Sequence, residues 1–482
     1  MKKHKKNVSI LFIIVMMLFA FIAMPKQSFA QSIDVTGGIL NEYQYEEYVF
    51  LTGKPIKFTG TTKNVSVTLK ESKGKLTESY KFTLTGPNKE KLTRNFVYTY
   101  DVENYDQIGQ STATGDVTKY TEKIVIGNKT FTLADYQLSK STVTDKRPAS
   151  DYYAGEAIAR KTYTVSKDGK EKVSVSIESR NEGYENFWGA TETQITDYNY
   201  TYESAKGNVE EGTIVNTVST TKSRTTEYNK STASLASFNG NYKTISSSDT
   251  VSKYEYDLPT VSGTVALDIA YMPKVEMLKI PKFRDLASNW AKYNIESLYS
   301  LGILDDDSNF FSPSTPILRY DFAIAIGKAI DIRVLEDSSR KKSKTTTSSV
   351  FKDVSKSKKD YEYLLAATQK GVITGVSATK FLPDSYLTRE QAATILIRAL
   401  GLEEKAPDPG YRTSYKDDYK ISDYARDSVY MATELGLLTG SYGSFNPKGS
   451  LTRAEASAII DRFLNHLEAN LKQNYRDDII NF

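Results

Sequence analysis

The chain of 482 residues contains 63 basic and 59 acidic side chains, two histidines and no cysteine. The lack of cysteine excludes disulfides, thiolate metal ligands and cysteine nucleophiles. His4 belongs to the leader described below, and His466 lies on the polar side of a predicted helix, so histidine-based catalysis and zinc binding are not expected. The composition therefore predicts no metal and no cofactor, and it leaves only carboxylate-based chemistry open.

The first thirty residues have the pattern of a secretory signal peptide. Lysines at positions 2, 3, 5 and 6 precede an apolar run from Val8 to Met24, which Pro25 ends. Ser28 and Ala30 place small residues at the two positions that signal peptidase reads, which predicts cleavage after Ala30. The alternative is an uncleaved membrane anchor, since the run is nearly long enough to span a bilayer. No second apolar run of that length follows, so no membrane span is expected after cleavage.

The net charge of +4 belongs to this leader. The first thirty residues carry five lysines and no acid, which leaves 58 basic (63 less 5) and 59 acidic side chains in the rest of the chain. Such a balance gives no reason to expect binding to nucleic acid or long-range attraction to anionic membranes.

Residues 31–280 show an apolar pattern of period two, which is typical of strands with one buried face. The alternation is clearest in five runs: Val65, Val67 and Leu69; Tyr80, Phe82 and Leu84; Phe96, Tyr98 and Tyr100; Val173, Val175 and Ile177; Tyr198, Tyr200 and Tyr202. Turn signals stand at Gly86-Pro87-Asn88, Gly127-Asn128, Asp168-Gly169 and Asn239-Gly240. This region is predicted to be all-β and antiparallel, as one large sandwich-like domain or two smaller ones.

Tyrosine is abundant in this region, which holds 21 of the 34 tyrosines. Its ring and hydroxyl suit a surface that binds sugars or proteins. Tyr and Thr are also good strand residues in a sheet with one solvated face. The second explanation is favoured, and the first stays open.

After Pro281 the apolar period becomes that of helices. Ala456, Ile459, Ile460, Phe463 and Leu464 form one apolar stripe. Residues 333–349 interrupt this region with a polar, basic segment. We predict that this segment is a flexible linker, with a basic wall-binding patch as the alternative.

A unit recurs three times in the helical region. Each copy opens with aromatic-x-Asp, reaches a glycine followed by two aliphatic residues, continues to Phe-x-Pro, and has an arginine six residues after the proline. The aspartates are Asp285, Asp353 and Asp417, the glycines Gly302, Gly371 and Gly436, the phenylalanines Phe311, Phe381 and Phe445, and the arginines Arg319, Arg389 and Arg453. Such units stack or bundle, because one copy cannot bury its own apolar faces.

The arginine begins the second helix of its copy. Thr388 with Gln391, and Thr452 with Glu455, form capping boxes that place Arg389 and Arg453 at the first helical position. The helix dipole disfavours a cation there by a few tenths to ~1 kcal/mol. Two explanations are weighed equally: an anion held by the guanidinium and free backbone N–H groups, or an ion pair with an acid such as the aspartate of aromatic-x-Asp. A third, less favoured, is that these arginines are simply exposed surface residues.

These motifs, in this order, resemble the S-layer homology repeat of bacterial surface proteins. The resemblance covers about 200 C-terminal residues. It implies a pseudo-threefold, monomeric module formed by one chain, which binds secondary cell-wall polysaccharide, typically with a pyruvylated amino sugar, in grooves between repeats. The ligand-binding residues that it implies are Arg389, Arg453 and, more weakly, Arg319, with Asp285, Asp353, Asp417 and Trp290.

The copies differ where the family often has Trp-Ala, twelve residues before the glycine. Here the chain has Trp290-Ala291, Lys359-Asp360 and Tyr424-Ala425. Trp290 belongs either to the sugar site or to the helix core, and the core is favoured. Copy one also has Leu318 in place of the threonine cap, so it is expected to bind weakly or to serve a structural role.

The predicted organisation is a signal peptide at 1–30, a β-rich region at 31–280, repeats at 281–332, 350–402 and 415–482, and linkers at 333–349 and 403–414. The predicted function is that of an exported, non-enzymatic surface protein of Gram-positive type. Its repeats anchor it non-covalently to the wall, and its β-rich region has an adhesive or structural role. The alternative is a glycan hydrolase on the same anchor, which needs two carboxylates ~5–9.5 Å apart. The candidate carboxylates are Glu182, Glu185, Glu192 and Asp197.

Overall fold

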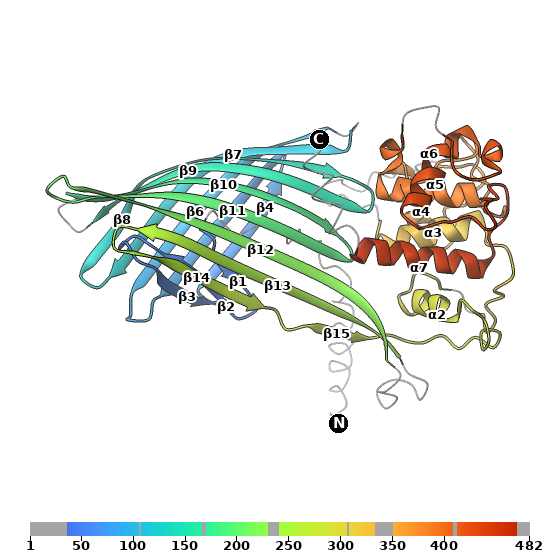
Figure 1. The fold of residues 1–482 in the computed structure, drawn as a ribbon, viewed down its shortest axis with the longest axis horizontal. Coiled ribbons are helices and arrows are strands. Elements are labelled where there is room, and N and C mark those ends of the chain that lie inside the picture. Colours follow the sequence, from blue (N-terminus) through green and yellow to red (C-terminus); the bar gives the residue numbers. More distant parts are fainter. Residues whose placement is uncertain are drawn as a thin grey trace, which may run out of the picture. The chain divides into compact units, whose positions relative to one another are not determined.

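The computed structural model describes residues 36–105, 108–165, 170–229, 241–305, 308–332, 350–407 and 412–469. The predicted signal peptide, the linker at 333–349 and the turn signals at Asp168-Gly169 and Asn239-Gly240 lie outside these residues. Along the chain the strands come first and the helices follow (Figure 1). The predicted classes, all-β antiparallel and then helical repeats, are confirmed.

The N-terminal region forms a single antiparallel sheet. Neighbouring strands follow the order β1-β2-β3-β5 and then, one by one, β6 to β14, while β4 pairs with β5 and β15 pairs with β13. Val67 and Leu69 on β4 are exposed, because this strand pairs on one side only and buries neither face. The strands are β1 (Ile39–Leu40), β2 (Gln44–Val49), β3 (Ile56–Thr61), β4 (Val65–Ser72), β5 (Lys75–Thr85), β6 (Lys91–Tyr105), β7 (Gln110–Ile126), β8 (Lys129–Lys146), β9 (Ser150–Val165), β10 (Glu171–Asn186), β11 (Gly189–Glu203), β12 (Val209–Asn229), β13 (Asn241–Leu258), β14 (Val261–Ala270) and β15 (Lys274–Met277).

The sheet curls until its first residues reach its last strands. The Tyr254 hydroxyl donates to the Thr36 carbonyl at 3.0 Å, and the Ser252 hydroxyl donates to the Gly37 carbonyl at 2.7 Å. These are side-chain bonds, and no backbone ladder joins β1 to β13 or β14 among the described residues. One curled sheet therefore replaces the two layers that "sandwich-like" implied, because the twist of successive strands accumulates over so many of them.

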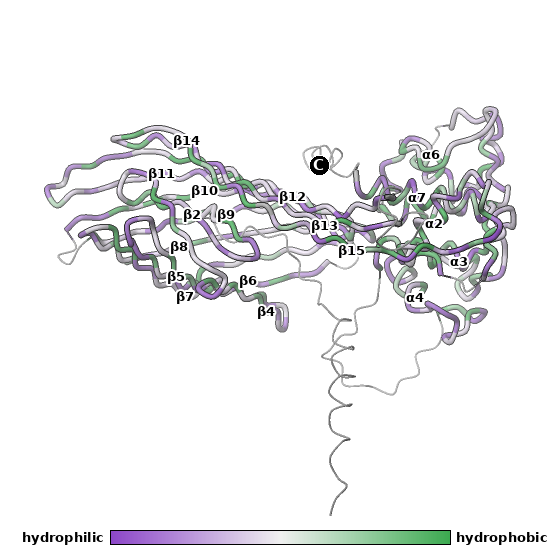
Figure 2. The backbone as a smooth tube through the Cα atoms, turned by 90° about the horizontal axis from the view of Figure 1, so that it is seen from below, coloured by the Kyte–Doolittle hydropathy of each residue, from purple (hydrophilic) through white to green (hydrophobic). Residues whose placement is uncertain are grey.

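Alternate residues of the strands point into the curl and form its core, and Figure 2 shows hydrophobic and hydrophilic stretches alternating along the strands. The rings of Tyr45 and Phe82 lie 4.6 Å apart, and the rings of Phe96 and Tyr136 lie 5.0 Å apart. Many tyrosines thus fill the inner face and do not cover an outer one. The core includes Tyr45, Tyr80, Tyr98, Tyr100, Tyr136, Tyr163, Tyr200 and Tyr254.

A buried charge cluster lies among these rings. Arg94 donates from Nη1 and Nη2 to the Glu47 carboxylate at 2.8 and 3.0 Å, and its Nε pairs with Glu122. The Tyr45 hydroxyl donates to Glu47 at 2.7 Å. Burial opposes the ionisation of Glu122, but Arg94 and then Lys161 hold the pKa of its carboxyl below the usual value. A buried ion pair of this kind needs good geometry and further hydrogen bonds, and here all three guanidinium nitrogens of Arg94 bond carboxylate oxygens.

The C-terminal region contributes two helices from each copy of the repeat. These are α2 (Lys292–Ser300) and α3 (Arg319–Ala329), α4 (Tyr361–Gln369) and α5 (Arg389–Leu400), α6 (Arg426–Glu434) and α7 (Arg453–Ala469), with the short 3₁₀ turns η1 (Glu403–Lys405), η2 (Asp418–Lys420) and η3 (Asp423–Ala425). Gly302, Gly371 and Gly436 follow the first helices with φ of 72°, 73° and 66°, as the predicted left-handed caps require.

The second helices bury their apolar residues in one common core. Phe322 and Ile326 of α3, Leu396 of α5 and Phe463 of α7 are fully buried within it. His466 is only 3% exposed, so its predicted place on a polar face is wrong. The reason is that α7 is covered over most of its circumference, which a single apolar stripe did not indicate.

Candidate functional site

Backbone hydrogen bonds join the three copies in a ring. The N–H of Ile317 donates to Leu451 at 2.9 Å, that of Leu451 to Leu387 at 3.0 Å, and that of Leu387 back to Ile317 at 3.0 Å. Each of these residues precedes its arginine by two positions. The ring therefore brings the N-termini of α3, α5 and α7 together around one pseudo-threefold axis.

The first N–H groups of these helices are already bonded. Those of Arg319, Arg389 and Arg453 donate to the carbonyls of Ser385 (2.8 Å), Gly449 (3.0 Å) and Thr315 (2.8 Å) in neighbouring copies. The next N–H groups donate to prolines of the Phe-x-Pro elements: Tyr320 to Pro383, Glu390 to Pro447 and Ala454 to Pro313. The expectation of free N–H groups for an anion is therefore wrong, because the neighbouring copy supplies the acceptors.

The predicted capping boxes are present. Thr388 accepts from the Gln391 N–H while the Gln391 side chain accepts from the Thr388 N–H, and Thr452 and Glu455 do the same. Arg319, Arg389 and Arg453 are accordingly the first residues of α3, α5 and α7. With the backbone donors occupied, only side chains are left to bind an anion here.

Each guanidinium lies on the phenylalanine ring of the next copy. The distances from Cζ to the ring centroid are 4.8 Å for Arg319 on Phe381, 5.1 Å for Arg389 on Phe445 and 4.5 Å for Arg453 on Phe311. The three motif arginines thus lie at the three seams between copies, and each one is supported by an aromatic face.

Hydrogen bonds to the same neighbouring copy fix two of the guanidinium groups. Arg319 Nη2 donates to the Thr374 carbonyl at 2.8 Å, and Arg389 Nη2 donates to the Thr439 carbonyl at 2.7 Å. No ion pair joins Arg319 or Arg389 to a carboxylate within the described part of the chain. Burial lowers the pKa of both groups. They are cations whose hydration is reduced, and neither makes a direct contact with a carboxylate, although Glu455 and Asp417 lie near enough to Arg389 to act on its charge.

The aspartates of aromatic-x-Asp do not pair with these arginines. Asp353 accepts the N–H groups of Phe381 and Leu382 at 2.9 and 2.8 Å, and Asp285 and Asp417 bind the equivalent N–H groups of their own copies. Desolvation would raise the pKa of Asp353, but these backbone hydrogen bonds hold it below its usual value. Each aspartate therefore shapes the turn that carries the phenylalanine under an arginine.

The residues at the Trp-Ala position lie on the surface. Trp290 is 65% exposed, so the interpretation as helix core is wrong. Its indole is accessible to a ligand. Lys359 is also exposed, and its Nζ bonds the carbonyl and the carboxylate of Asp305 at 2.7 and 2.9 Å. The Tyr424 hydroxyl donates to Glu390 at 3.1 Å. The three seams thus differ in chemistry although they share one arginine motif.

A cavity of about 320 Å³ opens beside Arg453. Arg453, Lys328, Lys358 and Lys359 line it, and so do the three carboxylates Asp305, Asp321 and Asp360. Tyr299 and Phe311 supply aromatic walls. A volume of this size is within the range of small-ligand sites, and the mixed polar and aromatic lining suits a charged sugar.

Glu390 is a site residue that sequence reasoning did not identify. It is buried and accepts from Ser422 N–H, the Ser422 hydroxyl, Tyr424 and Lys448. Tyr320 occupies the same helical position in copy one, and its hydroxyl donates to the Lys359 carbonyl at 2.7 Å. An acid in the first turn is too common in helices to signal such a network from sequence alone.

The candidate carboxylates of the sheet divide between its two faces. Gly183 lies opposite Glu192, so Glu182, one residue along, points to the other face. Asp197 shares the face of Glu182, but four residues along the strands separate them, or about 13 Å. Glu185 and Glu192 share the other face, where the buried Glu192 accepts from the Tyr153 hydroxyl at 2.9 Å. Of these four candidates, only Glu185 and Glu192 share a face and lie within two residues of each other along the paired strands, as a carboxylate pair requires.

Comparison with known families agrees with this ring of repeats. A family model described as "S-layer homology domain" matches residues 282–323, 350–393 and 414–457. The chain carries three S-layer homology domains. Such domains bind cell-wall polysaccharide, and this chain is a secreted protein of the cell surface.

Curated relatives share only part of the chain. An amylopullulanase of Thermoanaerobacterium thermosulfurigenes is 31% identical over 44% of this chain and 11% of its own length. The surface-layer 125 kDa protein of Lysinibacillus sphaericus is 28% identical over 44% of this chain and 17% of its own length. A cellulosome-anchoring protein of Acetivibrio thermocellus is 33% identical over 20% of this chain and 21% of its own length. The chain thus spans less than a quarter of the length of these relatives.

The described residues contain neither a helix that could span a membrane nor a cluster that could hold a metal ion. None of their helices has both the length and the apolar character needed to cross a membrane. Their His, Cys, Asp and Glu side chains form no group of three or more that could hold a metal ion.

Proposed function

We propose that this protein fastens itself non-covalently to the wall by binding pyruvylated secondary cell-wall polysaccharide at the seams between its S-layer homology domains. Arg389 and Arg453 would bind the pyruvate carboxylate, and the exposed indole of Trp290 would stack on a sugar ring. The observation that supports this most is the arginine geometry. The half-buried guanidinium of Arg389 rests on an aromatic ring, and within the described residues it forms no ion pair with a carboxylate. A bound carboxylate would supply a direct, bidentate partner.

Arg319 fits a structural role better than a binding role. It is only 6% exposed, whereas Arg389 and Arg453 are half-buried. A ligand reaches a half-buried guanidinium without unpacking the seam. This difference agrees with the expectation that copy one binds weakly.

Sedimentation of the full secreted chain with cell-wall sacculi tests the proposal. The sacculi are used intact, after mild acid removal of the pyruvyl ketal, and after full extraction of the secondary polysaccharide. Binding to intact walls and loss of binding after either treatment are expected. Equal binding to extracted walls would exclude the polysaccharide mechanism.

Arginine variants locate the site in the same assay. Arg389→Ala and Arg453→Ala should each weaken binding by about tenfold or more, which is the worth of one charge-assisted hydrogen bond. Arg284→Ala is the matched control, because Arg284 is an exposed arginine of the same module and is not one of the three motif arginines. Variants that bind normally while keeping the wild-type unfolding temperature would make these arginines purely structural.

The antiparallel sheet of the N-terminal region, β1 to β15, is called the display sheet below. We propose that it has no enzymatic activity and serves an adhesive or structural role. Glu47 and Glu122 are buried and bound to Arg94, which supports this proposal. The rival hydrolase would have to use Glu185 and Glu192. Incubation of the full chain with cell walls should release no reducing sugar. Release that Glu192→Gln abolishes would establish the hydrolase instead.

The module is also proposed to act as a monomer. One chain supplies all three copies, and the hydrogen-bond ring closes without a second chain. Light scattering behind size exclusion should give the mass of one chain, and a trimer mass would contradict this.

A further inference from the structure

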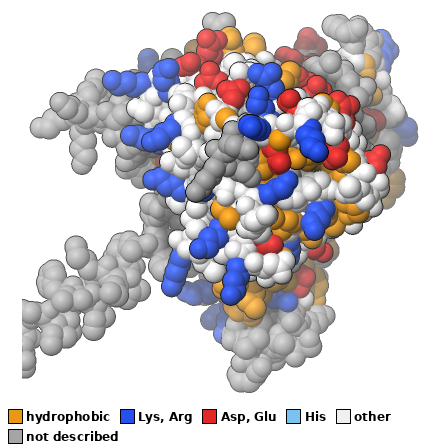
Figure 3. Space-filling model, turned by 90° about the vertical axis from the view of Figure 1, so that its left-hand side faces the viewer, with side chains coloured by type: hydrophobic (Ala, Val, Ile, Leu, Met, Phe, Trp, Pro, Cys, Tyr) orange, Lys and Arg blue, Asp and Glu red, His pale blue; other side chains and the backbone are white. Residues whose placement is uncertain are grey.

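The outer face of the display sheet carries a concentration of positive charge that the overall composition does not show. Figure 3 shows basic, acidic and apolar side chains interspersed over the face that it displays, as expected for a chain near neutrality. The outer side of β5, β6 and β7 differs from this mixture. Lys81, Lys91, Lys119 and Lys123 are all exposed there, with Lys63 at the turn before β4. We refer to these five lysines as the basic face.

Residues that pair with one another across β5, β6 and β7 form a row perpendicular to the strands, and strand register places these lysines in successive rows. Lys119 pairs with Val97, Lys81 with Asn95, Lys123 with Thr93, and Lys91 with Thr85. Each of four consecutive outer rows, from Ser79 to Thr85 on β5, therefore contributes one lysine. Rows on one face are two residues apart, or about 7 Å, so four rows extend over about 20 Å. The result is a strip of charge, with one lysine in each row, spread over three neighbouring strands.

No carboxylate stands within these rows. The outer residues of β5, β6 and β7 in the four rows are lysines, threonines, a serine, an asparagine and two valines, while Glu78 and Glu122 point to the inner face. The five ammonium groups form no ion pair and no hydrogen bond within the described part of the chain. This segregation contrasts with Lys75 and Lys129, which pair with Asp101 and Glu171 outside the four rows.

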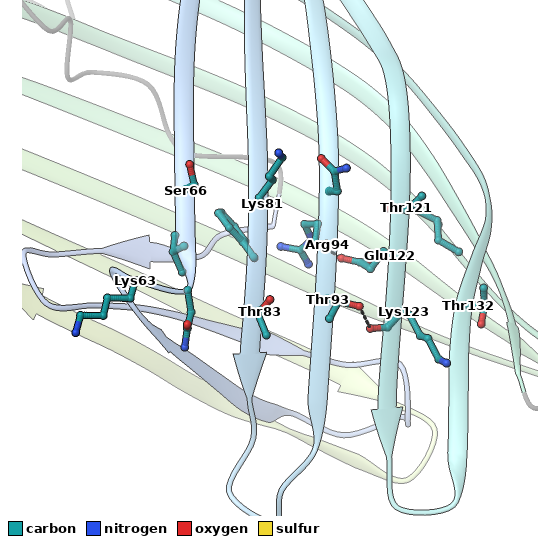
Figure 4. A pocket seen from close by; sticks show the side chains of 15 residues that line it. Lys63, Ser66, Lys81, Thr83, Thr93, Arg94, Thr121, Glu122, Lys123 and Thr132 are labelled. Atoms are coloured by element: carbon teal, nitrogen blue, oxygen red, sulfur yellow. Dashed lines mark hydrogen bonds and ion pairs between the residues drawn. The ribbon is translucent and has the colours of Figure 1, made fainter.

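A shallow trough of about 710 Å³ lies over the two middle rows, those of Lys81 and Lys123, and reaches Lys63. Figure 4 shows Lys81, Thr83, Thr93, Thr121, Lys123 and Thr132 around it, on neighbouring strands. Ser66 and Asn95 also line it, so hydroxyl and amide groups stand between the ammonium groups. These groups can donate to and accept from the hydroxyls of a sugar or polyol.

We propose that the basic face binds a linear wall polymer of polyol phosphate units joined by phosphodiester bonds. Lysines are effective point-charge binders of phosphate, and one lysine in each of four successive rows suits an extended polymer with many anionic groups. Single-stranded nucleic acid is a poorer fit, because it requires aromatic platforms for base stacking and the outer residues of these rows include no aromatic ring. The site is separate from the arginine seams and does not rest on their ligand.

Titration of the full secreted chain with poly(glycerol phosphate) tests this, with dextran as the neutral polymer and a single-stranded oligonucleotide as the competing phosphodiester. Poly(glycerol phosphate) should bind at low ionic strength, with an affinity that falls linearly in log–log form as salt rises. Dextran should not bind. Absence of poly(glycerol phosphate) binding, equal binding of dextran, or tighter binding of the oligonucleotide would overturn the proposal.

The lysine variant gives the decisive comparison. Lys81→Gln/Lys123→Gln should lower the affinity by about tenfold and reduce the salt slope by about two, one for each lost phosphate contact. These exposed positions should leave the fold intact. Lys206→Gln/Lys274→Gln removes the same charge from exposed positions elsewhere in the sheet region and should bind like wild type. If the two double variants weaken binding equally, net charge is responsible and the basic face is not a site.

Discussion

Asp353→Asn should destabilise the helical module, because the Asp353 carboxylate holds the distant turn at Phe381 and Leu382. The Asp353 carboxylate accepts two backbone N–H groups, from Phe381 and Leu382, at 2.9 and 2.8 Å. An asparagine can accept only one of them, and its amide N–H groups face the other donor. Hydrogen bonds to charged groups contribute about 1.5–3 kcal/mol each. Because the carboxylate is mostly exposed, we expect a loss of about 1.5–2 kcal/mol in the free energy of unfolding.

The same interaction makes the free energy of unfolding depend on pH. The folded-state pKa of Asp353 lies below its unfolded value, so the carboxylate stabilises the fold above the unfolded pKa, near 3.9. This stability is lost as the pH falls through the folded pKa. The wild-type advantage over Asp353→Asn should therefore be full at pH 7 and should shrink below about pH 4.

Urea unfolding of the full chain, followed by circular dichroism at 222 nm to report the helices, measures both effects. Asp384→Asn is the control, because Asp384 is an exposed carboxylate of the same copy that pairs only with Lys358. It should change stability by less than about 0.5 kcal/mol. Equal stability of Asp353→Asn and Asp384→Asn at pH 7 would refute the role of the aspartate in holding the turn.

Three other predictions concern single positions. Leu382 and Asn446 both have left-handed backbone, with φ of 61° and 58°, a conformation that asparagine tolerates better than leucine. Leu382→Asn should therefore raise the free energy of unfolding by about 0.5–1 kcal/mol, and Asn446→Leu should lower it by the same amount. Changes of the opposite sign would contradict this. Burial and then Asp461 raise the pKa of Glu468 to about 7, so the contribution of this carboxyl to the free energy of unfolding falls as the pH rises from about 4.5 to 7. Glu468→Gln should therefore have a free energy of unfolding about 1 kcal/mol higher than wild type at pH 8 and equal to wild type at pH 4. Glu390→Gln should lower the unfolding temperature by several degrees in a thermal melt, because the buried carboxylate organises four donors, and an unchanged temperature would assign the network no role in stability.

Local signals determined the elements of this fold because each depends on neighbours in sequence. Alternation at Tyr80, Phe82 and Leu84 marked a strand, and the caps at Thr388 and Gly371 marked the ends of helices. The threefold recurrence of the motif indicated three equivalent units without any knowledge of contacts. The S-layer homology resemblance followed from the same spacing.

Several features of the site depended on partners more than thirty residues away in the sequence. The N–H groups of Arg319 and Arg389 are bonded to Ser385 and Gly449, so the helix ends are not open to an anion as local reasoning suggested. The same distance hid the buried Glu390, whose donors Ser422 and Lys448 come from the next copy. Spacing within a repeat carries no information about the neighbouring repeat that completes it.

The sequence by itself determined the strands, the helices, the three copies and the arginine at the head of each second helix, because periodicity and capping are properties of a short stretch of chain. Only the tertiary structure decided that the sheet curls into one layer, that His466 is buried while Trp290 is exposed, and that each arginine rests on the ring of another copy. It also decided that Lys81, Lys91, Lys119 and Lys123, from three separate strands, stand in consecutive rows of one face. Strand pairing and helix packing join distant residues, and burial is settled only by what those distant residues cover.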